Sequence, residues 1–346
     1  MAKTAIAERI WISRVSNLVR FIARHYGATS ACSIGVAALC VAVLSSAAVA
    51  EPKRLFCALI PHFKDEYWLS VGYGLEQEAK RENVDLLFFE AGGYRARAQQ
   101  IEQLDLCVKR GVDAVLIGAV TSDHPDLITA IDDAAGSIPI FGLVNELHAG
   151  TLRGRIGVDW QDMGAVVGRY LSELHPDGSP PQTAVFITGP PMAGWTGPLE
   201  AGLRDGLTDS AVTLTGVYGA DTGLRAQLAL VETALEEYPN ADYLIGSAPA
   251  VEAAIGLLAS RPGAEGPLLV ATYANHTIKR GLMNGSVLAA SFDDPMRQGR
   301  MAIRQATSIT SAPVGPAGPG VLLLTNGDDN LSDIRMSPAG YFPSIQ

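Results

Sequence analysis

The feature that most constrains the fold is an alternation of short apolar runs with longer stretches of helical periodicity. After the apolar run at residues 55–60, Trp68, Val71, Leu75 and Ala79 recur at spacings of three and four, which marks one face of a helix. Parallel strands joined by helical crossovers are what this alternation specifies. The sequence therefore predicts an α/β fold of doubly wound, Rossmann-like parallel sheets.

The alternation runs twice, and the 346 residues suit two domains rather than one. In the first half we expect strands at 55–60, 84–89, 114–118, 139–143 and 155–158, with further helices at 95–110 and 125–135. In the second half we expect strands at 183–187, 212–217, 243–247, 268–272 and 287–291, with helices at 163–174, 198–207, 224–236, 250–260, 278–283 and 296–307.

Residues 156–164, near the middle of the chain, join the two halves as the end of a strand running into a helix. Ligands of open α/β sheets bind beyond the carboxyl ends of strands, so Asp159 and Trp160 stand where a ligand would lie. Tyr273, which ends a later strand, marks a second candidate crossover. We therefore expect a bilobed binding protein with crossover hinges at its cleft.

These crossovers set the expected limits of the lobes. The first lobe would comprise residues 51–158 plus about 274–294, and the second would comprise 159–273 plus about 295–310. Residues 311–346 are expected to form an irregular tail, because 311–320 are rich in Pro and Gly.

Residues 1–50 read as an export signal. Five basic residues precede an apolar run at 31–48, and the small-x-small site Ala48-Val49-Ala50 comes directly before Glu51. The alternative is an uncleaved membrane anchor, since the run is nearly long enough to span a bilayer. We expect cleavage and a periplasmic location, because small residues dominate the run.

The charge of the mature chain argues against nucleic-acid partners. Without residues 1–50 the chain has 21 basic and 35 acidic residues, hence a formal charge of −14. Such a surface repels nucleic acid, and no cluster of Lys or Arg interrupts it in the sequence. DNA-binding repressors with a similar bilobed body are therefore disfavoured.

Two cysteines, Cys57 and Cys107, remain after the signal. An even pair in an oxidising compartment is consistent with a disulfide, which would tie the first strand to the second helix. Two buried thiols are the alternative, and spacing alone does not decide between them.

Catalytic signatures do not emerge from the sequence. It has no Walker A loop, no G-x-S-x-G elbow and no H-E-x-x-H pair. Its histidines show no metal-ligand spacing, and Gly92-Gly93 is a tight turn rather than a phosphate loop. We therefore expect neither an enzyme nor a metal or cofactor site.

Aromatic residues instead mark the points where strands end. The five residues concerned are Tyr67, Trp68, Tyr94, Trp160 and Tyr273. In a bilobed α/β protein these points face the cleft, whereas the alternative for each residue is packing in a core.

A cage of aromatic faces with few charges suits a methylated ammonium, whose positive charge is weakly hydrated. Tyrosine hydroxyls and tryptophan N–H groups can also donate to an attached oxygen. Asp159 either complements the cation or caps the helix that begins at Trp160, and we favour the cap slightly.

Four segments carry a family resemblance: residues 61–71 (PHFKDEYWLSV), 90–94 (EAGGY), 157–160 (GVDW) and 246–248 (GSA). In this order they resemble the TorT family of type I periplasmic binding proteins, over residues 55–306. The resemblance implies binding of trimethylamine N-oxide and regulation of a TorS-like membrane-bound hybrid sensor histidine kinase, whose two-component signalling controls anaerobic respiration of this compound.

The family's aromatic pocket maps onto the same five residues, Tyr67, Trp68, Tyr94, Trp160 and Tyr273. Ribose-binding relatives carry Asn-Pro-Phe-Phe at residues 65–68 and an aspartate near Tyr273. This chain lacks that aspartate, and because a sugar needs polar partners for its hydroxyls, the difference argues against a sugar ligand. Trp195 lies in a second-lobe loop that can reach the cleft, and no family counterpart is assigned to it. If it narrows the pocket, ligand preference differs within the methylamine class.

Two further functions are weighed against this sensor. A substrate-binding component of an ABC transporter, for a sugar or a methylated amine, would share the fold, the signal and the cleft. A periplasmic enzyme is disfavoured, because the sequence offers no combination of nucleophile, base and orienting group.

Overall fold

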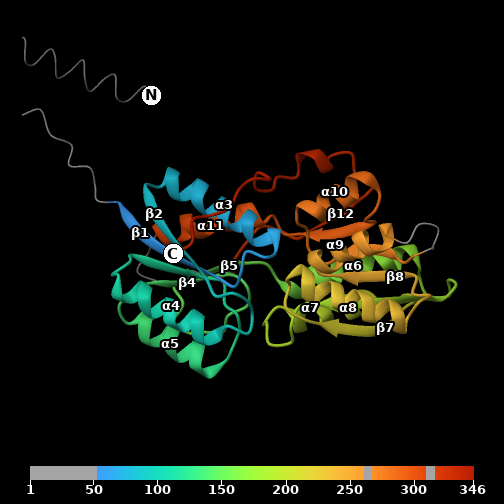
Figure 1. The fold of residues 1–346 in the computed structure, drawn as a ribbon, viewed down its shortest axis with the longest axis horizontal. Helices are drawn as coiled ribbons and strands as arrows, with labels where there is room; N and C mark the ends of the chain where they lie inside the picture. The colour runs from blue at the N-terminus through green and yellow to red at the C-terminus, as the bar shows by residue number, and fades with distance from the viewer. Residues whose placement is uncertain (1–52, 261–265, 309–315) are drawn as a thin grey trace, which may run out of the picture. The chain divides into compact units, whose positions relative to one another are not determined.

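The computed structural model describes residues 53–260, 266–308 and 316–346. The signal or anchor predicted for residues 1–50 lies outside them. These residues form two six-stranded sheets with interleaved helices, which confirms the predicted fold class (Figure 1). No helix in the described ranges has the length and apolar character needed to cross a membrane.

The first sheet has the order β11-β5-β4-β3-β1-β2, and its pairings are all parallel. Its central strands are buried along their whole length because helices cover both faces. Figure 1 places α4 (Arg97–Lys109) and α5 (Pro125–Ala135) on one face, and α3 (Glu66–Arg81) and α11 (Pro295–Thr307) on the other. The strands are β1 (Arg54–Ile60), β2 (Val84–Glu90), β3 (Ala114–Ile117), β4 (Ile140–Val144), β5 (Gly154–Gly157) and β11 (Pro316–Ala317).

The second sheet has the order β12-β10-β9-β8-β6-β7, and only β12 runs antiparallel to its neighbour. Among its helices, α6 packs against α7, and α9 packs against both α8 and α10. The strands are β6 (Gln182–Thr188), β7 (Val212–Gly219), β8 (Tyr243–Gly246), β9 (Leu268–Ala271), β10 (Ala289–Phe292) and β12 (Leu322–Thr325). The helices are α6 (Trp160–Leu174), α7 (Thr196–Gly206), α8 (Leu224–Glu237), α9 (Ala248–Ala259) and α10 (His276–Asn284), with a 3-10 turn η1 (Leu331–Asp333).

The lobe limits differ from the expected ones after residue 273. The first crossover lies between β5 and α6, as expected, but Tyr273 leads into α10 of the second lobe rather than back to the first. β10 then pairs with β9 in the second sheet, so 274–294 does not join the first lobe. The return occurs at Asp293 and Asp294, because the following helix, α11, packs on α3. The predicted assignment of 295–310 to the second lobe is therefore also reversed for α11.

The tail is more ordered than its composition suggested. Residues 316–317 add strand β11 to the first sheet, and β12 closes the edge of the second sheet against β10. Ile345 forms a bridge with Phe88 of β2. The chain thus passes between the lobes again after α11, and the tail belongs to both.

Close packing of α3 on α11 depends on two glycines. A Cβ at Gly74 would lie 2.1 Å from the carbonyl oxygen of Met296, and one at Gly299 would lie 2.3 Å from that of Val71. No side chain fits there, so the two helix backbones approach each other directly. This contact fixes the start of α11 beside Tyr67 in α3.

A disulfide joins Cys57 in β1 to Cys107 in α4. Of the two alternatives left open by the sequence, the structure contains the bond rather than two thiols. It fixes a helix of the outer face to a central strand of the first sheet.

Candidate ligand-binding site

The carboxyl ends of strands in both lobes lead into aromatic side chains. Tyr67 and Trp68 follow β1 in the first turn of α3, Tyr94 follows β2, Trp160 follows β5 and Tyr273 follows β9. All five predicted residues line one cavity between the lobes. Strand ends of both sheets therefore point aromatic groups at the same space.

The rings of this cavity pack edge to face. Tyr67 contacts Trp68 at 5.9 Å between centroids and Tyr273 at 5.4 Å, with interplanar angles of 84° and 75°. This is a favourable geometry for aromatic pairs. Because Tyr67 belongs to the first lobe and Tyr273 to the second, the aromatic wall is continuous across the cleft.

Trp195 completes the wall as a sixth aromatic residue. It precedes α7 in the second lobe, and its ring lies 5.1 Å from Trp160 and 6.2 Å from both Tyr94 and Tyr273, centroid to centroid. It is only 2% exposed, and its indole nitrogen has no hydrogen-bond acceptor of good geometry among the described residues. From the sequence we expected the loop of Trp195 to reach the cleft, but we did not predict Trp195 as a site residue.

Asp65 is the carboxylate of the cavity, and sequence reasoning missed it. It caps α3 by accepting the backbone N–H of Tyr67, and its other oxygen accepts the Tyr273 hydroxyl at 2.6 Å. Burial raises the pKa of Asp65, although these hydrogen bonds oppose the shift. The signal available was an acidic residue between the end of β1 and the aromatic pair.

A second buried carboxylate lies behind Tyr67. This carboxylate belongs to Asp293, and the Tyr67 hydroxyl donates to it at 2.7 Å. The Gln298 amide donates to both the Tyr67 oxygen and the Asp293 carboxylate. Burial raises the pKa of Asp293 to about 6, against the effect of these hydrogen bonds. Asp293 stands at the crossover into α11, so this network ties the hinge to the aromatic wall.

The end of β4 supplies Asn145 and a strained residue. The Asn145 amide donates to the Tyr94 hydroxyl at 3.3 Å and to the carbonyl of Ala119. Burial raises the pKa of Tyr94 to about 12, while the hydrogen bond from Asn145 opposes the shift. Val144 beside it has a φ of 65°, which a β-branched residue rarely adopts, and such strain is typical of functional sites.

A polar cluster joins the lobes at the edge of the cavity. His62, after β1, lies 3.0 Å from the Thr222 hydroxyl and 3.2 Å from the Asp221 carboxylate, both of the second lobe. Asp221 also accepts the backbone N–H of Tyr94. Burial raises the pKa of Asp221, but His62, the Tyr94 backbone N–H and Lys64 together outweigh it, and the net shift is downward. These contacts hold the cleft closed on one side.

The enclosed space is small. The positions open to the centre of a water molecule occupy about 10 Å³, which is about what one water needs. A ligand with several heavy atoms would therefore require the rings or the lobes to move apart.

Asp159 caps α6 and does not line the cavity. It is exposed and accepts the backbone N–H of Gln161 at 2.8 Å. Of its two predicted roles, the structure places it in the capping one. The described residues also contain no group of three or more His, Cys, Asp or Glu side chains able to hold a metal ion.

The two-lobed fold with an interlobe cavity is that of a solute-binding protein. Residues 56–312 match the periplasmic binding protein domain family, so the chain belongs to the periplasmic binding proteins. Members of this family are binding proteins of the periplasm, not enzymes.

Within this family the chain is similar to the periplasmic protein TorT of Escherichia coli (strain K12). The identity is 35% over 293 residues, covering 83% of each chain. The resemblance to the TorT family is therefore confirmed.

Solved structures give the same relationship. Two structures of the complex between the TorS sensor domain and TorT are similar to this chain. The structure solved in the absence of ligand has a TM-score of 0.75, and the structure solved in the presence of trimethylamine N-oxide has a TM-score of 0.74. In both, the identity is 34%, and the match covers 85% of this chain and 100% of the matched chain. An ABC transporter solute-binding protein from Bradyrhizobium sp. BTAi1, with bound Bis-Tris, matches at 0.70 and 33% identity, over 86% of this chain and 90% of that one.

Proposed function

We propose that this periplasmic protein binds trimethylamine N-oxide in the interlobe cavity and thereby regulates a TorS-like hybrid sensor histidine kinase. The observation that carries the proposal is a ring of six buried aromatic side chains, drawn from both lobes, in a chain 35% identical to TorT. The TorS–TorT complex solved with trimethylamine N-oxide supplies the chemical identity of the ligand.

The cavity suits the two ends of this ligand differently. Its trimethylammonium end spreads positive charge over methyl groups, which aromatic faces and the buried Asp65 carboxylate attract. Its oxygen requires a donor, and the Tyr94 hydroxyl and the Trp195 indole N–H lie on the same wall. Each end therefore has a chemically matched group.

Ligand contacts in both lobes would couple binding to closure. Tyr67, Trp68 and Tyr94 belong to the first lobe, whereas Trp195 and Tyr273 belong to the second. A ligand that touches both sets favours, by its differential affinity, the lobe separation at which both sets can reach it. The kinase would respond to the separation of the lobes.

An ABC transporter role for a sugar or a methylated amine is the alternative function. The similarity to the Bradyrhizobium solute-binding protein favours it, and Bis-Tris is itself an amine. A sugar is disfavoured, because the polar side chains of the wall are few and Asp65 is already bonded to Tyr273.

The size of the ligand limits its affinity. Five heavy atoms at a ceiling of roughly 1.5 kcal/mol each allow about 7.5 kcal/mol, hence a dissociation constant of a few micromolar at best. We expect micromolar or weaker binding by the isolated protein, and nanomolar binding without the kinase would contradict this account.

The test is a calorimetric titration of residues 51–346 with trimethylamine N-oxide, betaine, trimethylamine and ribose. We expect heat with the N-oxide, loss of that heat in Trp160→Ala and Trp195→Ala, and no change in Met192→Ala, which alters an exposed side chain of the Trp195 loop. Saturable ribose binding instead of N-oxide binding would favour the transporter.

A further inference from the structure

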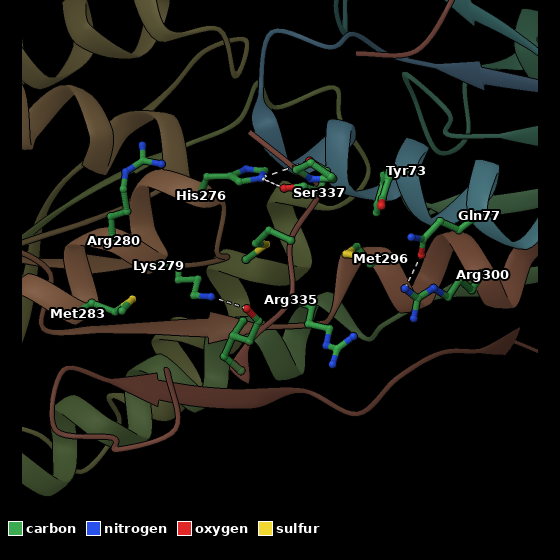
Figure 2. Close-up of a pocket in the computed structure, with 13 residues that line it drawn as sticks. Tyr73, Gln77, His276, Lys279, Arg280, Met283, Met296, Arg300, Arg335 and Ser337 are labelled. Atoms are coloured by element: carbon green, nitrogen blue, oxygen red, sulfur yellow. Dashed lines mark hydrogen bonds between the residues drawn. The ribbon is translucent and has the colours of Figure 1, made fainter. Parts of the chain in front are cut away.

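A groove outside the aromatic cavity runs between the two lobes. Its walls are α10 of the second lobe and α3 and α11 of the first, with residues 334–338 along it (Figure 2). We call it the basic groove and define it by Lys279, Arg280, Arg300, Arg335, Met283 and Met336. Its volume is about 560 Å³, far larger than the aromatic cavity.

The four cations of the basic groove have no acidic partners. No Asp or Glu lines it, and within the described ranges none of the four lies within 4.0 Å of a carboxylate. The Lys279 ammonium donates to two backbone carbonyls, Arg280 to the Thr277 hydroxyl and Arg300 to the Gln77 amide oxygen.

Two carboxylates near the groove are engaged with other side chains. Glu66 lies 3.5 Å from His276, and Glu78 binds Arg304 through both its oxygens. In a chain of net charge −10, four cations without acidic partners on one groove favour an anionic ligand.

The apolar side chains of the groove indicate a protein rather than a small anion. Met283 is 57% exposed, and Met296 and Met336 line the same space. Methionine and arginine are enriched at protein interfaces, where methionine adapts its shape to the partner. The chemistry therefore fits an amphipathic segment that presents carboxylates beside apolar side chains.

The groove is also bonded to both lobes. The Ser337 backbone N–H donates to the Ser70 hydroxyl of α3, and its carbonyl accepts from His276 of α10 at 2.7 Å. Residues 334–338 are thus bonded to both lobes, and the walls of the groove belong to both. A partner seated there would contact both lobes and would bind differently when their separation changes.

We propose that the basic groove docks an acidic, amphipathic segment of the sensor-kinase ectodomain; the identity of this partner rests on the proposed function. The segment places carboxylates against Arg280, Arg300 and Arg335, and an apolar side chain against Met283 and Met336.

The test measures binding of residues 51–346 to the immobilised periplasmic domain of the TorS-like kinase from the same genome. Arg280→Glu/Arg335→Glu should weaken binding at least about tenfold, because both side chains are exposed and the reversal repels the acidic segment. Arg169→Glu/Arg225→Glu changes the charge equally at exposed positions on α6 and α8, and should stay within about twofold. Both variants should bind trimethylamine N-oxide like the unmodified protein.

Added salt separates charge from other effects. The affinity of the unmodified protein for the kinase domain should fall with added sodium chloride more steeply than that of Arg280→Glu/Arg335→Glu.

Kinase binding by this variant within about twofold of the unmodified protein overturns the groove proposal alone. Ligand binding without any kinase binding by the unmodified protein overturns the kinase partnership, and the groove proposal with it. Loss of kinase binding in the variant supports the groove even where trimethylamine N-oxide does not bind.

Discussion

The three tyrosine hydroxyls of the cavity are not equivalent as donors. Tyr67 and Tyr273 each donate to a buried carboxylate, Asp293 and Asp65 respectively. Tyr94 instead accepts a hydrogen bond from Asn145, so its own proton remains available. At the scale of single residues, Tyr94 is therefore the hydroxyl best placed to donate to a ligand oxygen.

Tyr94→Phe should weaken binding of trimethylamine N-oxide by roughly 10- to 150-fold, because one hydrogen bond to a charged acceptor contributes about 1.5–3 kcal/mol. Binding of trimethylamine, which lacks the oxygen, should change little. Calorimetric titration of both ligands checks this, with Tyr170→Phe, outside the cavity, as the control. Equal losses for the two ligands would show that the ring, not the hydroxyl, matters.

Asp293 should make folding stability depend on pH. Its pKa is raised from 3.8 to about 6 in the folded protein, so between these values the folded state binds more protons than the unfolded state. The free energy of unfolding should therefore fall by about 3 kcal/mol as pH rises from below 4 to above 6.

Urea unfolding of the wild type and Asp293→Asn across pH 3–7 isolates this effect, since asparagine does not titrate. The difference between the two proteins should change by about 3 kcal/mol in favour of the variant as pH rises. Asp162→Asn, an exposed control in α6, should follow the wild type. A difference that stays constant with pH would contradict the raised pKa.

The sequence indicated the aromatic residues of the site because each follows the end of a strand. Asn145 follows β4 in the same way, but an amide at a strand end is common in turns and gave no specific signal. Asp65 has two simultaneous roles, and only the helix cap is a local one. Its bond to Tyr273 joins residues 208 positions apart, which no local pattern predicts.

At the scale of elements, contact between α3 and α11 determines how the hinge meets the cavity. The alternating pattern predicted both helices, since apolar periodicity is a property of each segment. The pattern does not predict which lobe α11 joins, because a helix that follows β10 can pack on either sheet. Gly74 and Gly299 decide this, because they allow the backbones of α3 and α11 to touch.

Gly299→Ala should reduce the free energy of unfolding by roughly 1–3 kcal/mol, because the added Cβ would lie 2.3 Å from a backbone oxygen. Gly256→Ala is the matched control, since it lies in α9 with nothing within 4 Å of the added carbon. It should be neutral or stabilising by up to about 1 kcal/mol. Urea denaturation compares them, and equal stabilities would show that the helices separate without cost.

At the scale of the whole molecule, the aromatic cavity and the basic groove both have walls in each lobe. Asp65 with Tyr273, and His62 with Asp221, bond one lobe to the other at the cavity, whereas Ser337 connects the lobes at the groove. If closure carries the signal, the two sites must be thermodynamically linked, and the linkage must be equal in both directions.

Saturating trimethylamine N-oxide should change the affinity for the kinase ectodomain by the same factor as saturating ectodomain changes the affinity for trimethylamine N-oxide. A factor of about 5–150 is typical of such coupling. Paired titrations measure the affinity for the ectodomain with and without ligand, and the affinity for the ligand with and without ectodomain. The ligand is kept at millimolar concentration, below the range in which the N-oxide acts as a general osmolyte. In Trp160→Ala the ligand should no longer alter kinase binding.

The repeated passage of the chain between lobes also limits how such genes can recombine. A single breakpoint at the codons for residues 158 and 159 would not exchange one lobe for another, because α11 is encoded far downstream yet packs on α3. A hybrid of two related genes would place one parent's α11 against the other parent's α3, at a contact where a carbon added to Gly74 or Gly299 would meet backbone oxygen. Viable hybrids should therefore require a second breakpoint before residue 293, so that both helices descend from the same parent.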